Sequence, residues 1–314
     1  MYRIGIDLGG TNIVAGVVDK NYNLIATARC KTNAPRPADE IIGDMARMSR
    51  EAVKSANLTM DDIDGIGVGC PGACNLDTGI VERAENLDFI NEPVQEKLQS
   101  LLGKPVSLEN DANAAAYGEM LAGAAKGTRH ALCITLGTGV GGGAIVDGHI
   151  IAGHNFAGGE LGHTVIVMDG EPCSCGRRGC WEAYASATGL IRQTKAAMGA
   201  HKDSAMWQLS ENGTRVNGRT AFDAMRAGDE TGKQVVEQYI RYLACGLTNM
   251  VNIFQPEVLC IGGGISHEGE TLLAPVREIV EKEQFAQTSA SKTRIVAAEL
   301  GNDAGIIGAA YVGV

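Results

Sequence analysis

Four apolar, β-branched runs that each stop at glycines constrain the fold of this chain most. In chain order they read RIGIDLGGTN from Arg3, IGVGCPGA from Ile66, ALCITLGTGVGGGAIV from Ala131 and VLCIGGGIS from Val258. Such a run is typical of a buried strand that feeds a loop with exposed backbone N–H groups. Helical patterns lie between the runs, notably at residues 232–254, and strands that alternate with helices predict an α/β fold.

The length of the chain predicts two lobes. Its 314 residues exceed the roughly 250 to 300 residues at which a single hydrophobic core stops growing, so we expect two lobes with a central cleft. The first and third runs look like one hairpin with a Gly/Thr turn, used at the start of each half. We place a smaller lobe at residues 1–118 plus 302–314 and a larger lobe at residues 119–301.

Charge and patterning exclude several classes of partner. The formal net charge is -10, without clusters of Lys and Arg, which argues against nucleic acid. The longest uncharged stretch, residues 131–146, is rich in Gly and Thr and shorter than the ~20 apolar residues of a membrane helix. The first run reaches Asp7 at once, leaving no room for a secretory segment. We therefore expect a cytoplasmic protein with no membrane partner.

The turn after the first run is suited to bind phosphate. Asp7 ends the strand and is followed by two glycines, a hydroxyl and an amide, namely Gly9, Gly10, Thr11 and Asn12. Bare N–H groups can then approach phosphate oxygens, while Asp7 holds Mg²⁺ through water. Thr138 and Gly139 offer a second turn of this kind. Neither turn is a Walker loop or a G-x-G-x-x-G loop, and tight hairpins without a ligand remain the alternative.

Three of the glycine runs share a resemblance. DLGGTN, LGTGVGGG and IGGGIS resemble the two phosphate loops and the adenosine loop of the actin-like ATPase superfamily, whose fold is ribonuclease H-like. The resemblance implies a duplicated α/β lobe with ATP in the cleft, and it assigns Gly263 and Gly264 to the adenosine loop.

The segment ENDANAAA places a carboxylate at the start of a helix. A strand at residues 105–108 runs into this strong helix former, so Asn110 or Asp111 lies at the helix N-terminus. Either residue could simply be the N-cap. In the functional interpretation, the helix dipole keeps Asp111 ionised at pH 7, ready to take a proton from an alcohol during phosphoryl transfer.

One histidine and three cysteines form a complete donor set for zinc. They follow the pattern H-x9-C-x-C-x4-C, with His163, Cys173, Cys175 and Cys180. A closed His/Cys3 set leaves no open position, so the Zn²⁺ is expected to be structural; core or redox cysteines are the alternative. The metal would pin the segments that carry two nearby carboxylates, which can accept hydrogen bonds from sugar hydroxyls: Glu160 and Glu182.

The same block carries the most specific resemblance. GGELGH with CSCGRRGCWEAYAS resembles the signature of the ROK family of sugar kinases and repressors, and DLGGTN, PGA, ENDANAAA and GGGIS follow in the expected order over essentially the whole chain. The resemblance implies catalysis by Asp111. It also implies sugar contacts from the Gly72 turn, Asn86, Asn110, Glu160, His163 and Glu182. His163 would then both bind zinc and touch sugar.

These observations predict an ATP-dependent hexose kinase that phosphorylates the 6-hydroxyl. Glucose is the first substrate expected; N-acetylmannosamine, N-acetylglucosamine, allose and fructose stay open. A sugar-responsive regulator is an alternative within the family, although the strand that begins at Arg3 leaves no room for a helix-turn-helix ahead of it. An actin-like ATPase that acts as a scaffold is a further alternative, but it would not explain the presence of Glu160 and Glu182. The family resemblance suggests a homodimer or tetramer.

Overall fold

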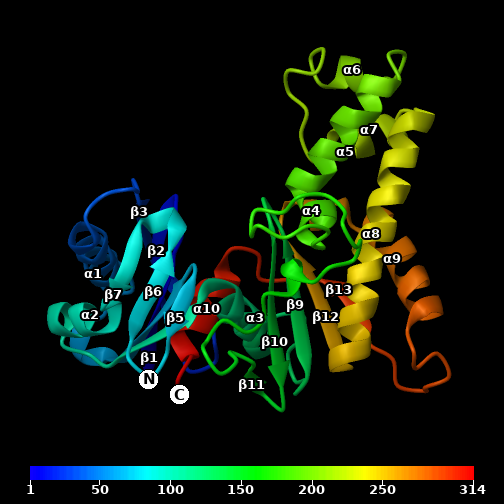
Figure 1. Cartoon of the computed structure of the whole chain (residues 1–314). Helices are drawn as coiled ribbons and strands as arrows, with labels where there is room; N and C mark the ends of the chain where they lie inside the picture. Colours follow the sequence, from blue (N-terminus) through cyan, green and yellow to red (C-terminus); the bar gives the residue numbers. More distant parts are fainter. The chain divides into compact units, whose positions relative to one another are not determined.

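The computed structural model describes residues 1–314, and the chain forms two compact units (Figure 1). The first unit comprises Met1–Cys133, Gly143–Gly159 and Ala298–Val314. The second comprises Ile134–Gly142 and Glu160–Ala297. Strands and helices alternate through most of the chain, which confirms the predicted α/β class.

A five-stranded sheet forms the centre of the first unit, in the order β3-β2-β1-β4-β8. The first three strands form an antiparallel meander, and β1, β4 and β8 are parallel. β1 is buried on both faces, with Ile4, Ile6 and Leu8 on one face and Gly5 on the other, as fits a central strand. The strands are β1 (Tyr2–Leu8), β2 (Asn12–Asp19), β3 (Leu24–Lys31), β4 (Ile63–Cys70) and β8 (Val106–Asn110).

Two pairs of helices and a small sheet complete this unit. A large apolar core joins the sheet to α1 (Ala38–Ser55) and α2 (Val94–Leu102), and a second apolar cluster lies under α10 (Asp303–Tyr311). The small antiparallel sheet has the order β5-β6-β7. The remaining elements are α3 (Asp111–Ala122), β5 (Ala73–Asn75), β6 (Ile80–Ala84), β7 (Phe89–Glu92), η1 (Met60–Asp62) and η2 (Glu85–Leu87).

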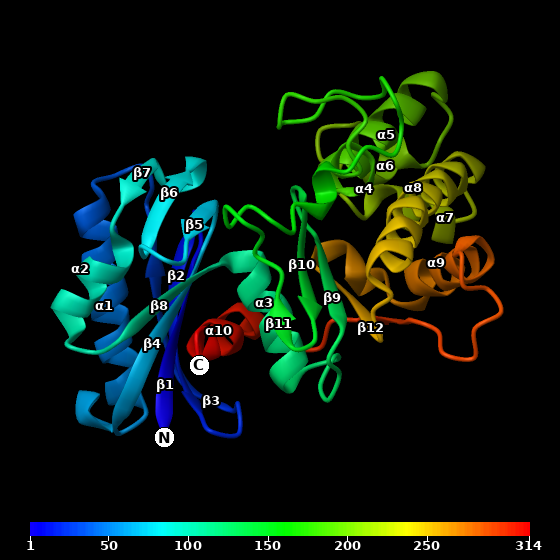
Figure 2. The same ribbon diagram turned by 60° about the horizontal axis from the view of Figure 1, so that its bottom comes forward.

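Glycines allow the last helix to pack unusually close to the first strands. Helix α10 lies against β1, β4 and α3, as Figure 2 shows. A Cβ atom on Gly5 would lie 1.8 Å from the Ile306 carbonyl oxygen, and one on Gly67 would lie 1.7 Å from that of Ala309. Only glycine fits at these two strand positions. The close packing holds the end of the chain beside the strands that carry the site.

The second sheet repeats the order of the first. Its order, β11-β10-β9-β12-β13, matches β3-β2-β1-β4-β8 strand for strand, with β12 and β13 parallel like their counterparts β4 and β8. The hairpin predicted once per half is therefore present twice. The strands are β9 (Ala131–Leu136), β10 (Val140–Val146), β11 (His149–Ile150), β12 (Val258–Gly262) and β13 (Arg294–Ala297).

The longest helix, α8 (Glu230–Phe254), organises the helical part of the second unit. Asp229 caps it by accepting a hydrogen bond from the Gly232 N–H at 2.6 Å. Gln255, with φ of 46°, ends it just before Pro256. The other helices are η3 (Leu161–His163), α4 (Glu182–Ala185), α5 (Ala187–Ala200), α6 (Met206–Leu209), α7 (Thr220–Arg226), η4 (Gly264–Glu268) and α9 (Glu270–Glu283). None of the helices has the length and apolar character needed to cross a bilayer.

Candidate active site

The carboxyl ends of three parallel strands bring together the predicted residues of the first unit. Asp7 on β1 is in register with Gly69 on β4, and Cys70 is in register with Asn110 at the end of β8. In open α/β sheets, ligands bind beyond these strand ends. The register therefore carries Asp7 and Asp111, which lie more than a hundred positions apart in the sequence, to one edge of the sheet.

Two polar residues, Asn110 and Asp111, lie at the start of helix α3, and only one of them is its N-cap. Asn110 is the N-cap of α3, because its Oδ1 accepts hydrogen bonds from the N–H groups of Ala112 at 2.9 Å and Asn113 at 3.2 Å. Its Nδ2 donates to the Gly72 carbonyl oxygen at 3.2 Å. Asp111 is the first residue of the helix proper and is not needed as the cap. The structure thus assigns the cap to Asn110, and the Asp111 carboxylate is not the N-cap of α3.

Burial affects the pKa of Asp111 more than the start of helix α3 does. The pKa of Asp111 is raised by burial, although the Ala112 N–H, which donates to its Oδ1 at 2.8 Å, acts in the opposite direction. Burial therefore affects this pKa more than the hydrogen bond at the helix start does, and the ionised state of Asp111 at pH 7 stays a prediction. A raised pKa makes the ionised form a stronger base, which favours proton abstraction from an alcohol.

The pKa of Asp7 is also raised. Burial, and then repulsion from Asp111, raise the pKa of Asp7 to about 6. Two carboxylates that repel each other in a partly buried site can be stabilised by a cation, and oxygen donors suit Mg²⁺. Asp7 thus fits the predicted magnesium position.

Replacing Asp7 by Asn is expected to stabilise the protein while weakening Mg²⁺-dependent nucleotide binding. The folded-state pKa of about 6 lies above the unfolded value of 3.8, so ionisation of Asp7 increasingly opposes folding as the pH rises from about 4 to about 6, and the full cost is present above that window. At pH 8 we expect Asp7→Asn to raise the free energy of unfolding by about 1–3 kcal/mol, a gain that shrinks as the pH falls toward 4. Urea unfolding at both pH values measures it.

The exposed Asp77→Asn variant serves as the matched control for Asp7→Asn. A stabilisation of the Asp7 variant that is the same at pH 8 and pH 4 would show that buried charge is not its cause.

The first glycine turn is tied to neighbouring segments of its own unit. The Gly9 N–H donates to the Asn12 carbonyl oxygen at 2.9 Å, and the Thr32 N–H donates to that of Thr11 at 2.9 Å. A Cβ on Gly10 would lie 3.2 Å from the Cβ of Asn86, so the exposed Asn86 lies beside this turn. The structure places Asn86 at the predicted phosphate loop rather than at a distance from it.

Gly72 occupies a position that other residues would strain. Its φ is 90°, and a Cβ there would lie 2.1 Å from the Arg83 carbonyl oxygen. The resulting turn presents the Gly72 carbonyl oxygen to Asn110. Gly72 therefore helps to orient the helix start that carries Asp111.

The second unit brings the other two glycine runs together. The Gly137 N–H donates to the Gly139 carbonyl oxygen at 3.0 Å, closing the turn between β9 and β10 around the exposed Thr138. Gly263 has a φ of 85°, and a Cβ on it would lie 2.4 Å from the Leu136 carbonyl oxygen. Gly264 follows as the first residue of η4. The predicted second phosphate turn and the predicted adenosine loop are thus neighbours.

Glu182, the first residue of α4, contacts the second turn directly. Its Oε2 accepts a hydrogen bond from the Val140 N–H at 3.1 Å, and a Cβ on Gly139 would lie 2.3 Å from the same oxygen. Its Oε1 accepts a hydrogen bond from the Ser174 hydroxyl at 3.0 Å. Both carboxylate oxygens are therefore engaged within the second unit.

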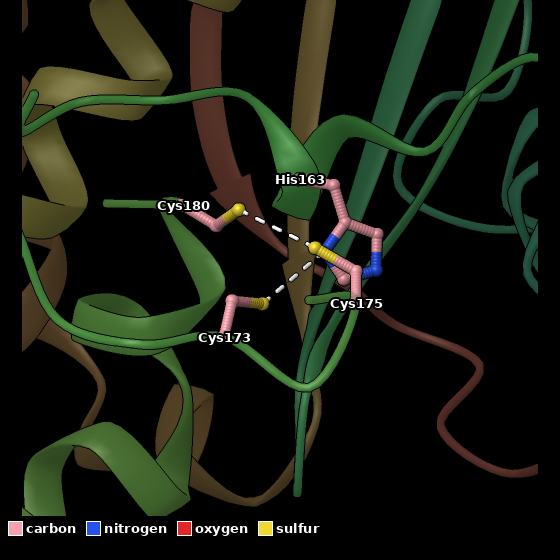
Figure 3. Close-up of side chains that lie close together, drawn as sticks. All are labelled: His163, Cys173, Cys175 and Cys180. Atoms are coloured by element: carbon pink, nitrogen blue, oxygen red, sulfur yellow. Dashed lines mark hydrogen bonds between the residues drawn. The ribbon is translucent and has the colours of Figure 1, made fainter. Parts of the chain in front are cut away.

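The four predicted metal donors form one cluster (Figure 3). Their donor atoms all lie within 4.8 Å of one another. The sulfurs of Cys175 and Cys180 are 3.6 Å apart, and Cys173 Sγ lies 3.5 Å from His163 Nδ1. Tetrahedral zinc, with bonds of about 2.3 Å to sulfur and about 2.0 Å to nitrogen, separates such atoms by about 3.5 to 3.8 Å. The cluster thus fits a structural zinc ion.

The two ring nitrogens of His163 have different neighbours: one lies next to the cysteines and the other next to Glu160. Nδ1 points toward Cys173, whereas Nε2 lies 3.9 Å from Glu160 Oε2. Binding of a metal through Nδ1 leaves Nε2 with a proton that it can donate. Glu160 itself is exposed, just before η3. This arrangement is compatible with the predicted double role of His163.

Known proteins match this chain over nearly its whole length. A model of the ROK family matches residues 3–313. The chain belongs to the ROK family. The glucokinase of Streptomyces coelicolor is 37% identical over 310 residues, which cover 98% of this chain and 96% of the relative. Both the resemblance stated from the motifs and the actin-like ATPase fold expected from it are confirmed.

Solved ROK structures match over nearly the full length. The glucokinase of Streptomyces griseus, in complex with glucose and AMPPNP, has a TM-score of 0.80 at 34% identity and covers 99% of this chain and 98% of its own. The ROK hexokinase of Thermus thermophilus has a TM-score of 0.83 at 32% identity, covering 99% and 97%. The xylose repressor of Caldicellulosiruptor bescii is 31% identical over 90% of this chain and 70% of its own. The relatives of this chain therefore include two sugar kinases and a repressor.

Two polar residues of this ROK chain, Glu109 and Ser174, make site contacts that the sequence patterns do not predict. Glu109 is buried, and its Oε1 accepts hydrogen bonds from the Asn110 N–H at 2.8 Å and from Asn113 Nδ2 at 3.0 Å. Burial raises its pKa. Ser174 donates to Glu182. Only the position of Glu109 directly before Asn110 could have indicated the first of these, and no spacing rule connects Ser174 with Glu182.

Proposed function

We propose that this chain is an ATP-dependent hexose kinase that phosphorylates the 6-hydroxyl of glucose. The observation that carries the proposal is the position of Asp111. It begins a helix whose cap is already supplied by Asn110, and it lies at the strand ends beside Asp7 with a raised pKa. A carboxylate placed in this way can accept a proton from an alcohol, while Asp7, at the end of β1 just before the turn at residues 9–12, would hold Mg²⁺.

The remaining residues would bind and orient the reactants. The turn at residues 9–12 would approach the phosphates in the first unit, and the turn at residues 137–139 in the second, next to the loop that begins at Gly263. Mg²⁺ held near Asp7 would neutralise charge on the phosphates. Sugar contacts are proposed for Gly72, Asn86, Asn110, Glu160, His163 and Glu182. The Asn110 side chain already caps α3 and bonds to Gly72, so it can offer sugar only its remaining amide proton.

Glucose is favoured because the glucokinases of Streptomyces coelicolor and Streptomyces griseus match over nearly the whole chain. N-acetylmannosamine, N-acetylglucosamine, allose and fructose are the alternative substrates. A sugar-binding regulator is the competing function, since a xylose repressor is also a relative. We further propose a cytoplasmic homo-oligomer, either a dimer or a tetramer.

A substrate panel in a coupled assay of ADP formation tests this proposal. Glucose should give the highest kcat/KM, about tenfold or more above that of the acetamido sugars, because an acetamido group must fit beside the 2-position. 6-Deoxyglucose should bind without being phosphorylated. Sugar binding without sugar-dependent ADP formation would favour the regulator, and a preference for an acetamido sugar would overturn the assignment of glucose.

A further inference from the structure

The second glycine turn is held at three points by the segment that follows the last metal ligand. The Ala187 N–H donates to the Gly137 carbonyl oxygen at 2.8 Å, and the Thr188 hydroxyl donates to that of Thr138 at 2.8 Å. The third bond is that of the Val140 N–H to Glu182. The orientation of the turn therefore depends on residues 182–188, which begin two positions after Cys180.

Glu182 extends this connection into the metal loop. Its Oε1 accepts the Ser174 hydroxyl at 3.0 Å and lies 3.6 Å from Cys173 Sγ. A metal-bound cysteine is a thiolate without a proton to donate. In the metal-loaded protein, the hydrogen bond from the loop to Glu182 is therefore supplied by Ser174, which lies between the two ligands Cys173 and Cys175.

We infer that Ser174 is a positioning residue through which the metal loop sets the conformation of the β9–β10 turn. The inference rests on the proposed function, because it takes this turn to be a nucleotide-binding loop. The Glu182 carboxylate occupies the space that a Cβ on Gly139 would take, and its Oε2 accepts the Val140 N–H, so the position of Glu182 is coupled to that of the turn. The metal site consequently supports nucleotide binding as well as sugar binding.

The Ser174→Ala variant tests this inference through binding of AMPPNP with Mg²⁺, titrated by calorimetry without sugar. Zinc ion is kept in slight excess, so that metal occupancy is equal in all variants. We expect affinity to fall about three- to tenfold, the effect of losing one typical hydrogen bond, because Ser174 is exposed and water partly replaces it. Ser174→Thr keeps the hydroxyl and should restore the affinity. Ser289→Ala, in an exposed loop of the same unit, is the matched control.

Hydrogen exchange of the Val140 amide gives a second, independent readout. The amide should exchange faster in Ser174→Ala than in wild type, because Glu182 then has one anchor fewer. Wild-type AMPPNP affinity together with wild-type Val140 protection in the zinc-loaded variant would overturn the inference. If wild type binds AMPPNP but forms no ADP with any sugar, the proposed function fails while the link through Ser174 is still tested.

Discussion

Replacing Asp111 by Asn should lower kcat by about 10²- to 10⁴-fold, the contribution of a positioned general base. Binding of sugar should change by no more than a few-fold, because the amide keeps the shape of the side chain and Asn110 still caps α3. Rapid-quench measurement of phosphoryl transfer, together with calorimetric titration of glucose, separates the two quantities. The thermal midpoint should stay constant or rise, since a partly buried charge is removed.

The matched control for this variant is Asp303→Asn. Asp303 is also the first residue of a helix in the same unit, but it is exposed. An Asp111→Asn enzyme that keeps a tenth or more of the wild-type rate would exclude Asp111 as the base, and a rate loss shared by Asp303→Asn would point to a general effect of helix-terminal charge.

Loss of the metal should have the second largest effect, on both stability and sugar binding. We expect about one zinc ion per chain and a fall of about 5 to 15 °C in the thermal midpoint on Cys175→Ser, since the loop between His163 and Cys180 loses the ion that binds its ends together. Sugar affinity should drop with it, because His163 and Glu160 lie on the same segment. Metal analysis, calorimetry and thermal unfolding measure these three quantities.

Cys245→Ser provides the comparison for the metal-site variant. Cys245 is a free, half-buried cysteine on α8 in the same unit, outside the cluster. Its replacement should leave both the metal content and the sugar affinity unchanged. A Cys175→Ser protein with full sugar affinity and unchanged melting would contradict the structural role of the cluster.

Local patterns in the sequence were sufficient to predict the strands, the turns, one helix start and the set of metal donors. The glycine runs predicted strands followed by turns, the residues of ENDANAAA predicted a helix start, and the spacing of His163, Cys173, Cys175 and Cys180 predicted a closed donor set. Each of these features depends on residues close together in the chain. Hydrophobic periodicity and side-chain chemistry act over such short distances, so a single sequence records them.

Tertiary structure decided the properties that depend on distant residues. Asp111 helps to raise the pKa of Asp7 only because β1, β4 and β8 are parallel and in register, which puts both carboxylates at one edge of the sheet. Burial at that edge also raises the pKa of Asp111, against the effect of the helix start. The link from Ser174 through Glu182 to Val140 likewise depends on how three segments fold together. Burial and electrostatic coupling depend on distances in space, and those follow from strand register and packing rather than from the order of residues along the chain.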